Sequence, residues 1–134
     1  MITVTLTTDW GTDGLYTGAF KGRLVSRIPG VQLVEISHQI DYLQPIKAAL
    51  ALQNSYSFFM AKTIHVLSVG GSANSMQPVQ HICFQYKNHY FIGPNNGIWE
   101  TIFNEIPTTV YALPSELSSK NFNSFPELEI YIDA

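Results

Sequence analysis

The sequence predicts an α/β domain of three layers, in which helices cover both faces of a mixed but mainly parallel β-sheet. Strand-like and helix-like segments alternate over residues 1–69, and a hairpin pattern follows them. Strands separated by helices pair in parallel through right-handed crossovers, whereas a hairpin adds antiparallel strands. In addition, 46% of the 134 residues are hydrophobic and 13% are charged, which is enough for a sizeable core. We expect one domain over residues 1–134.

The first two elements are a strand and a helix. Residues 2–8 are β-branched and apolar, and the turn-like sequence DWGTDG follows at 9–14. Apolar side chains then recur every four residues over 14–28, which predicts a helix with one buried face. Pro29 and Gly30 end this helix.

A second strand, a second helix and a third strand come next. Residues 31–37 (VQLVEIS) alternate between apolar and polar as a strand does, and 38–44 form a loop. Pro45 suits the first turn of a helix, and the Ala- and Leu-rich residues 46–56 continue it. Residues 63–69 (TIHVLSV) predict the third parallel strand.

The pattern then changes to a hairpin. Residues 70–75 (GGSANS) have the composition of a flexible loop. Two apolar stretches, 79–86 and 90–92, flank Lys87 and Asn88, which predicts an antiparallel pair with its turn at these residues.

The last part of the chain predicts shorter elements. We expect a tight turn at 93–97 (GPNNG), a short helix over 98–103 and a strand over 108–113. Apolar residues at helical spacing over 125–132 reach the end of the chain at Ala134 without a cap. We therefore expect a domain that is truncated at its C-terminus.

Composition excludes several classes of function. The net charge is −3 and the seven Lys and Arg residues are scattered, so no basic run predicts nucleic-acid binding. No stretch predicts a signal peptide or a membrane span, and Cys83, the only cysteine, forms no internal disulfide. We expect a cytoplasmic protein without membrane contact. Cys83 lies in an alternating apolar run, which indicates a buried, unreactive thiol.

The four histidines and the scattered acidic residues show no spacing typical of a metal site, so we expect no metal. His38 opens a loop after a strand and is expected to anchor that loop by a hydrogen bond. His65 is expected to be a half-buried structural residue, and His81 and His89, which flank the hairpin, are expected to be solvated.

Four segments, in order along the chain, carry a resemblance to a known family. They are LTTDWGT at 6–12, VEISHQI at 34–40, KTIHV at 62–66 and HYFIGPNNGI at 89–98. With this order and spacing, the chain resembles the N-terminal half of the S-adenosylmethionine hydroxide adenosyltransferases (the S-adenosylmethionine hydrolases), fluorinases and chlorinases. Each segment alone is a weak signal, but together they cover most of the chain.

The resemblance implies a set of residues for binding an adenosyl ligand: Asp9, Tyr16, Leu43 and Asn96. The family's Asp at the position of Asp9 binds the ribose hydroxyls, and a carboxylate can accept a hydrogen bond from each hydroxyl of a diol. The structural alternative is that Asp9 caps the following helix, although Asp13 is better placed to do so. Asn96 has a structural alternative too, because it belongs to a turn.

The family also implies an assembly. Its members have a C-terminal β-barrel domain, which we expect to be absent here, and they form trimers in which the ligand lies between neighbouring subunits. We therefore expect a homo-oligomer with a small-molecule adenosyl ligand. No cofactor is expected, since S-adenosylmethionine would be the substrate or ligand.

The chain departs from the family at the positions that perform catalysis. Where the hydrolases carry an Asp, an Arg and a His, this chain has Gly70, Met76 or Gln77, and a segment over 118–125 that contains no His. Leu43 replaces a Trp of the halogenating members. The sequence therefore predicts an S-adenosylmethionine- or adenosine-binding protein without an assigned catalytic residue. The alternative is a catalytically silent structural or sensing module.

Overall fold

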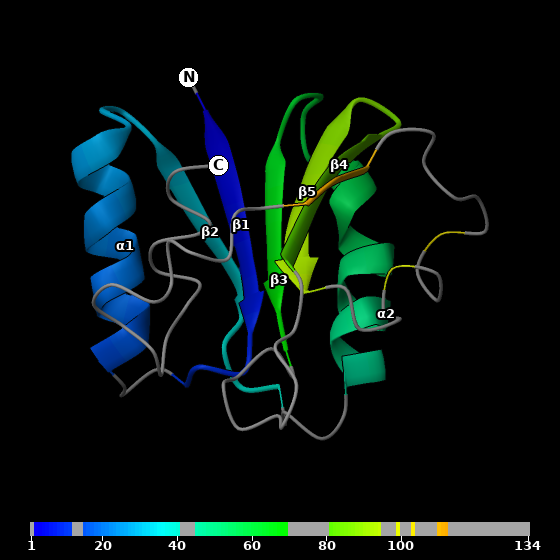
Figure 1. The fold of residues 1–134 in the computed structure, drawn as a ribbon, viewed down its shortest axis with the longest axis horizontal. Coiled ribbons are helices and arrows are strands. Elements are labelled where there is room, and N and C mark those ends of the chain that lie inside the picture. The colour runs from blue at the N-terminus through cyan, green and yellow to red at the C-terminus, as the bar shows by residue number, and fades with distance from the viewer. Residues whose placement is uncertain are drawn as a thin grey trace.

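A computed structural model describes residues 2–11, 15–40, 45–69, 81–94, 99, 103 and 110–112. The strands are β1 (Thr3–Thr8), β2 (Gln32–Ser37), β3 (Ile64–Ser68), β4 (His81–Tyr86), β5 (His89–Pro94) and β6 (Val110–Ala112). The helices are α1 (Leu15–Arg27), α2 (Pro45–Ser55) and the 3₁₀ turn η1 (Tyr56–Phe58). The two helices flank the sheet (Figure 1).

The sheet is mixed, as the sequence predicts. Its strand order is β2-β1-β3-β5-β4-β6. Strands β2, β1, β3 and β5 run parallel to one another, and β4 is antiparallel to both β5 and β6. The hairpin between β4 and β5 turns at Lys87 and Asn88, whose φ angles of 47° and 65° are those of a type I′ turn.

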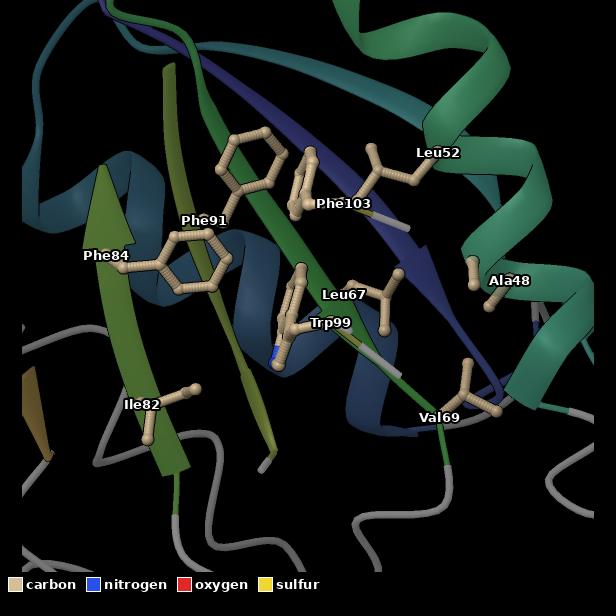
Figure 2. Packing of buried hydrophobic residues seen from close by; sticks show 10 residues of the cluster. Ala48, Leu52, Leu67, Val69, Ile82, Phe84, Phe91, Trp99 and Phe103 are labelled. Atoms are coloured by element: carbon tan, nitrogen blue, oxygen red, sulfur yellow. The ribbon is translucent and has the colours of Figure 1, made fainter. Parts of the chain in front are cut away.

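Each face of the sheet carries its own apolar core, because successive side chains of a strand point to opposite faces. Among the described residues, those buried on the α1 side are Val4, Leu6, Phe20, Leu24, Val66 and Ile92. On the α2 side, Phe84, Phe91, Trp99 and Phe103 form an aromatic group against Leu52 and Leu67 (Figure 2). These two cores confirm the three-layer α/β/α arrangement.

The predicted tight turn at 93–97 is wrong at its first two residues. Gly93 and Pro94 continue β5, where they pair with Ile82 and His81 of β4. Local turn chemistry is overridden here because the long antiparallel partner β4 extends the pairing. Residues 95–98 lie outside the described residues. Of the predicted helix over 98–103, the structure describes only Trp99 and Phe103, and the Phe103 N–H donates to the Trp99 carbonyl at 3.0 Å.

Other predicted segments fall outside the described residues: the loop over 70–75 and the helical pattern over 125–132. Within the part that the structure describes, neither helix is long and apolar enough to cross a membrane.

Candidate functional site

The strand order creates a topological switch point between β1 and β3. From β1, the chain runs through α1 to β2 on one side, and then through α2 to β3 on the other side. The two crossovers therefore place α1 and α2 on opposite faces of the sheet. In open α/β sheets, ligands bind outside the carboxyl ends of the strands at the point where the connections diverge. That point lies between the ends of β1 and β3, at the lower edge of the sheet in Figure 1.

Asp9 lies at this point. It follows β1 directly and is half-buried, and its backbone N–H donates to the Ser68 carbonyl at the end of β3 at 3.1 Å. Two further bonds join the turn after β1 to the end of β2: the Gly11 N–H donates to the His38 carbonyl at 2.7 Å, and the Ile40 N–H donates to the Thr8 carbonyl at 3.4 Å. The backbone around Asp9 is therefore held by both neighbouring strands.

Gly11 completes this turn with a φ of 79°, a left-handed conformation that favours glycine. Its carbonyl accepts a hydrogen bond from the Thr17 hydroxyl of α1 at 2.6 Å. The start of α1 is thereby joined to the turn that carries Asp9.

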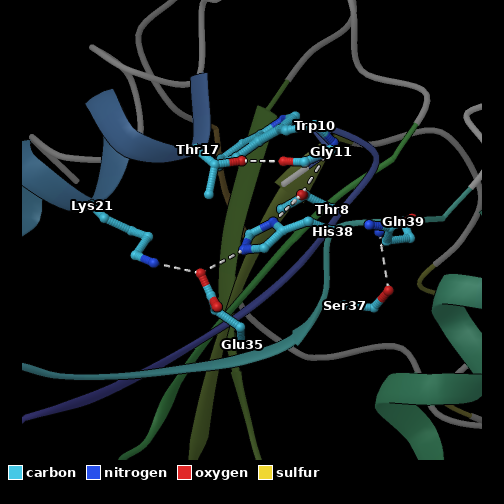
Figure 3. Close-up of polar contacts among 9 residues, drawn as sticks. All are labelled: Thr8, Trp10, Gly11, Thr17, Lys21, Glu35, Ser37, His38 and Gln39. Atoms are coloured by element: carbon cyan, nitrogen blue, oxygen red, sulfur yellow. Dashed lines mark hydrogen bonds and ion pairs between the residues drawn. The ribbon is translucent and has the colours of Figure 1, made fainter. Parts of the chain in front are cut away.

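A chain of polar side chains runs under the turn (Figure 3). The Thr8 hydroxyl lies 2.5 Å from His38 Nδ1, and His38 Nε2 lies 3.2 Å from Glu35 Oε1. Glu35 also forms an ion pair with Lys21 of α1 at 2.5 Å. An ionised carboxylate only accepts, so His38 Nε2 carries the ring proton and Nδ1 accepts from Thr8. The expected role of His38 as a loop anchor is confirmed by these contacts.

His38 is neutral in this setting. Its side chain is 2% exposed, and burial lowers its pKa from 6.5, although the carboxylate of Glu35 opposes that shift. The Trp10 ring stacks on the imidazole at 6.1 Å with an angle of 18° between the planes, and it also contacts Phe20 at 5.0 Å. Thr8, Glu35 and Lys21 were not singled out from the sequence. The separation of three residues between Glu35 and His38 is the sequence feature that could have indicated their contact.

Replacing Glu35 with Gln is expected to lower the pKa of His38 further. The change removes the negative charge that favours the imidazolium and leaves the charge of Lys21. An NMR titration of the His38 ring protons measures this shift. Because Glu35 and Lys21 are both exposed, we expect the free energy of unfolding to change by less than about 1 kcal/mol. Lys21→Met is the matched control, and it should move the pKa of His38 upward. A rise in the Glu35→Gln protein would contradict the assignment.

The other predicted site residues divide into two groups. Tyr16 lies near the start of α1, half-buried against the apolar core on that side, so it adjoins the edge of the sheet that carries Asp9. Leu43 and Asn96 lie outside the described residues, as do Asp13, Gly70, Met76 and Gln77.

A second polar group is buried between the sheet and η1. His65 Nδ1 lies 2.7 Å from the Thr5 hydroxyl, and its Nε2 lies 3.1 Å from His89 Nδ1. The Tyr56 ring contacts both imidazoles edge-on, at 6.2 Å and 5.4 Å. His65 is fully buried rather than half-buried, because its strand lies in the middle of the sheet.

The expectation that His81 and His89 are solvated is wrong. They are 4% and 6% exposed. His81 begins β4, which lies between β5 and β6, and Tyr56 lies against His89. Cys83 is half-buried, and burial raises the pKa of its thiol, which agrees with an unreactive cysteine. Among the described residues, no three His, Cys, Asp or Glu side chains are arranged to hold a metal ion.

Comparison with known proteins identifies the family of this chain. Residues 4–134 match the model of the S-adenosylmethionine hydroxide adenosyltransferase N-terminal domain. An (R)-S-adenosyl-L-methionine hydrolase of Methanocaldococcus jannaschii is 30% identical over 101 residues, which cover 72% of this chain and 37% of that protein. The chain thus spans little more than a third of this relative.

Two solved structures share the fold. A conserved uncharacterised protein of Thermotoga maritima superposes with a TM-score of 0.78 at 22% identity, over 97% of this chain and 54% of that one. A conserved hypothetical protein of Thermus thermophilus gives a TM-score of 0.73 at 17% identity, over 98% and 53%. Because the family model matches nearly the whole sequence, the chain belongs to the S-adenosylmethionine hydroxide adenosyltransferase family and corresponds to its N-terminal domain.

Proposed function

We propose that this protein binds the adenosyl moiety of S-adenosylmethionine at the carboxyl ends of β1 and β3, with the Asp9 carboxylate on the ribose. The observation that carries the proposal is the position of Asp9, at the end of β1 and bonded through its backbone to the end of β3. A ribose presents two adjacent hydroxyl donors, and a carboxylate presents two acceptor oxygens. Family membership supports the choice of an adenosyl ligand.

The proposal also assigns other residues to the adenosyl site. Tyr16 and Leu43 would line it and Asn96 would contact the ligand. The chain spans about half the length of the two solved structures that share its fold, and little more than a third of the hydrolase. We propose a cytoplasmic homotrimer in which a neighbouring subunit completes the adenine side.

The reaction of the family would break the bond between C5′ and sulfur, join a water oxygen to C5′ and release adenosine, methionine and a proton. Water is a poor nucleophile, so this displacement needs a positioned acceptor. Because Gly70, Met76 or Gln77, and the segment over 118–125 replace the family's catalytic residues, we propose ligand binding with slow hydrolysis or none. The second candidate, a structural or sensing module, rests on these same replacements.

Replacing Asp9 with Asn is expected to weaken adenosine binding by about 10- to 100-fold, because hydrogen bonds to a charged group contribute roughly 1.5–3 kcal/mol. The measurement is a thermal shift or calorimetric titration with adenosine and with S-adenosylmethionine. In the wild-type protein, a ligand at ~100 times its Kd adds roughly 2.7 kcal/mol of stability.

The matched control is a ligand rather than a variant. 2′,3′-Dideoxyadenosine lacks the diol, so Asp9→Asn should not weaken its binding further. If the variant loses both nucleosides equally, the ribose role of Asp9 is wrong. A parallel assay of methionine release separates an enzyme from a binding protein, and a wild-type protein that binds neither ligand would favour the structural module.

A further inference from the structure

The turn that carries Asp9 is held by the buried residue His38. His38 is 3% exposed and contacts the turn at three points. Its Nδ1 bonds to the Thr8 hydroxyl, its carbonyl accepts from the Gly11 N–H, and its ring stacks on Trp10. Asp9 lies between Thr8 and Trp10, so both of its neighbours in sequence are fixed by the same residue.

The direction of the hydrogen bonds explains why an imidazole suits this position. The Trp10 N–H donates to the Thr8 hydroxyl oxygen at 3.2 Å, and the hydroxyl in turn donates to His38 Nδ1. Nε2 then donates to Glu35. The turn therefore needs a buried acceptor at Nδ1, while Nε2 connects that acceptor to the surface pair of Glu35 and Lys21.

We propose that His38 is a positioning residue, which holds the Thr8–Trp10 turn so that the Asp9 carboxylate faces the ribose. This inference rests on the proposed function of Asp9. His38 acts through the backbone of the turn and contacts no reacting atom. Loss of its acceptor would release the Thr8 hydroxyl, to which the Trp10 N–H donates, and the direction of the carboxylate would no longer be fixed.

Paired substitutions separate positioning from general stability. Thr8→Val removes the hydroxyl at nearly constant shape, whereas Thr8→Ser keeps it. His38→Asn places an amide oxygen near the position of Nδ1, whereas His38→Gln reaches toward Glu35 and supplies no acceptor to Thr8. Thr8→Val and His38→Gln are expected to weaken adenosine binding about tenfold, the effect of one lost hydrogen bond. Thr8→Ser and His38→Asn should stay within about threefold of the wild-type Kd.

Urea unfolding of each variant shows whether it is folded before binding is compared. If a His38 variant fails to fold, the Thr8 pair alone decides. Wild-type affinity in Thr8→Val and His38→Gln would overturn the proposal, as would a Thr8→Ser protein that binds no better than Thr8→Val.

Amide hydrogen exchange gives a second measurement that needs no ligand. Exchange at Trp10 and Gly11 should be about tenfold faster in Thr8→Val and His38→Gln, while Phe84 in β4 remains as protected as in the wild type. Unchanged exchange at Trp10 and Gly11 would refute the positioning role of His38. A wild-type protein that binds no adenosine would instead refute the ribose role of Asp9, so the two failures are distinguishable.

Discussion

Between pH 7 and pH 5 the free energy of unfolding is expected to fall by roughly 4 kcal/mol, because two buried histidines are held neutral. Burial, and secondarily the neighbouring His89, lowers the pKa of His65 from 6.5 to about 3. Burial alone lowers the pKa of His81 to about 4. In the unfolded chain both rings return to their ordinary pKa and take up protons first.

The free energy of unfolding falls as the pH is lowered because the unfolded chain takes up protons before the folded protein does. A histidine whose pKa is lower in the folded state contributes its full stability above pH 6.5, and loses it as the pH falls toward the folded pKa. Each ring then removes roughly 1.4 kcal/mol per pH unit, which amounts to about 2 kcal/mol at pH 5. His38 and His89, whose pKa values are also lowered by burial, act in the same direction.

The geometry around His65 makes protonation costly. Its Nε2 faces His89 Nδ1 at 3.1 Å, so one of these nitrogens carries a proton and the other accepts it. Protonating both rings would bring two donors and two positive charges together inside the protein.

Urea unfolding at pH 7, 6 and 5 measures the loss. His65→Gln is the control variant, since its amide can hydrogen-bond with His89 from the position of Nε2 but does not titrate. It should reduce the loss between pH 7 and pH 5 to about 2 kcal/mol. A wild-type loss below about 1 kcal/mol would show that these rings are not kept neutral by folding.

The elements that the sequence predicts well are those whose signal is local. The apolar spacing that leads to Phe20 and Leu24 defines the buried face of α1, and the paired positive-φ residues Lys87 and Asn88 lie where the hairpin was expected to turn. Asp9 could be placed after the first strand for the same reason. A local pattern gives the element and its inward face, but it does not give the neighbour of that face.

Strand order and the burial of polar residues depend on such neighbours. Nothing in residues 31–69 says that β3 pairs with β1 on the side opposite β2, and the switch point at Asp9 exists only in that order. His89 adjoins a hairpin turn, yet it is buried by Tyr56, which is 33 residues earlier in the chain. The Thr8 hydroxyl likewise bonds to a residue that is 30 positions away in the chain, His38.

Gly93 shows how packing can decide the role of a residue that local chemistry assigns to a turn. It lies in β5 beside β3, where a Cβ atom would overlap the Leu67 carbonyl oxygen and would lie 2.6 Å from Cζ2 of Trp99. The carbonyl belongs to the backbone of a central strand. The indole is held by a hydrogen bond from its Nε1–H to the Pro94 carbonyl at 3.0 Å and by an edge contact with Phe84 at 5.1 Å.

Gly93→Ala is therefore expected to lower the free energy of unfolding by about 3 kcal/mol, at the upper end of what overpacking a core costs, because neither neighbour can move without breaking its own contacts. Gly22→Ala is the matched control. Gly22 is exposed in α1 and a Cβ there meets no atom within 4 Å, so this change should stabilise the protein by about 1 kcal/mol through helix propensity. The same substitution thus has opposite signs at the two positions, and urea unfolding at pH 7 measures both. A Gly93→Ala protein as stable as the wild type would mean that β3 and β5 are not in close contact at this position.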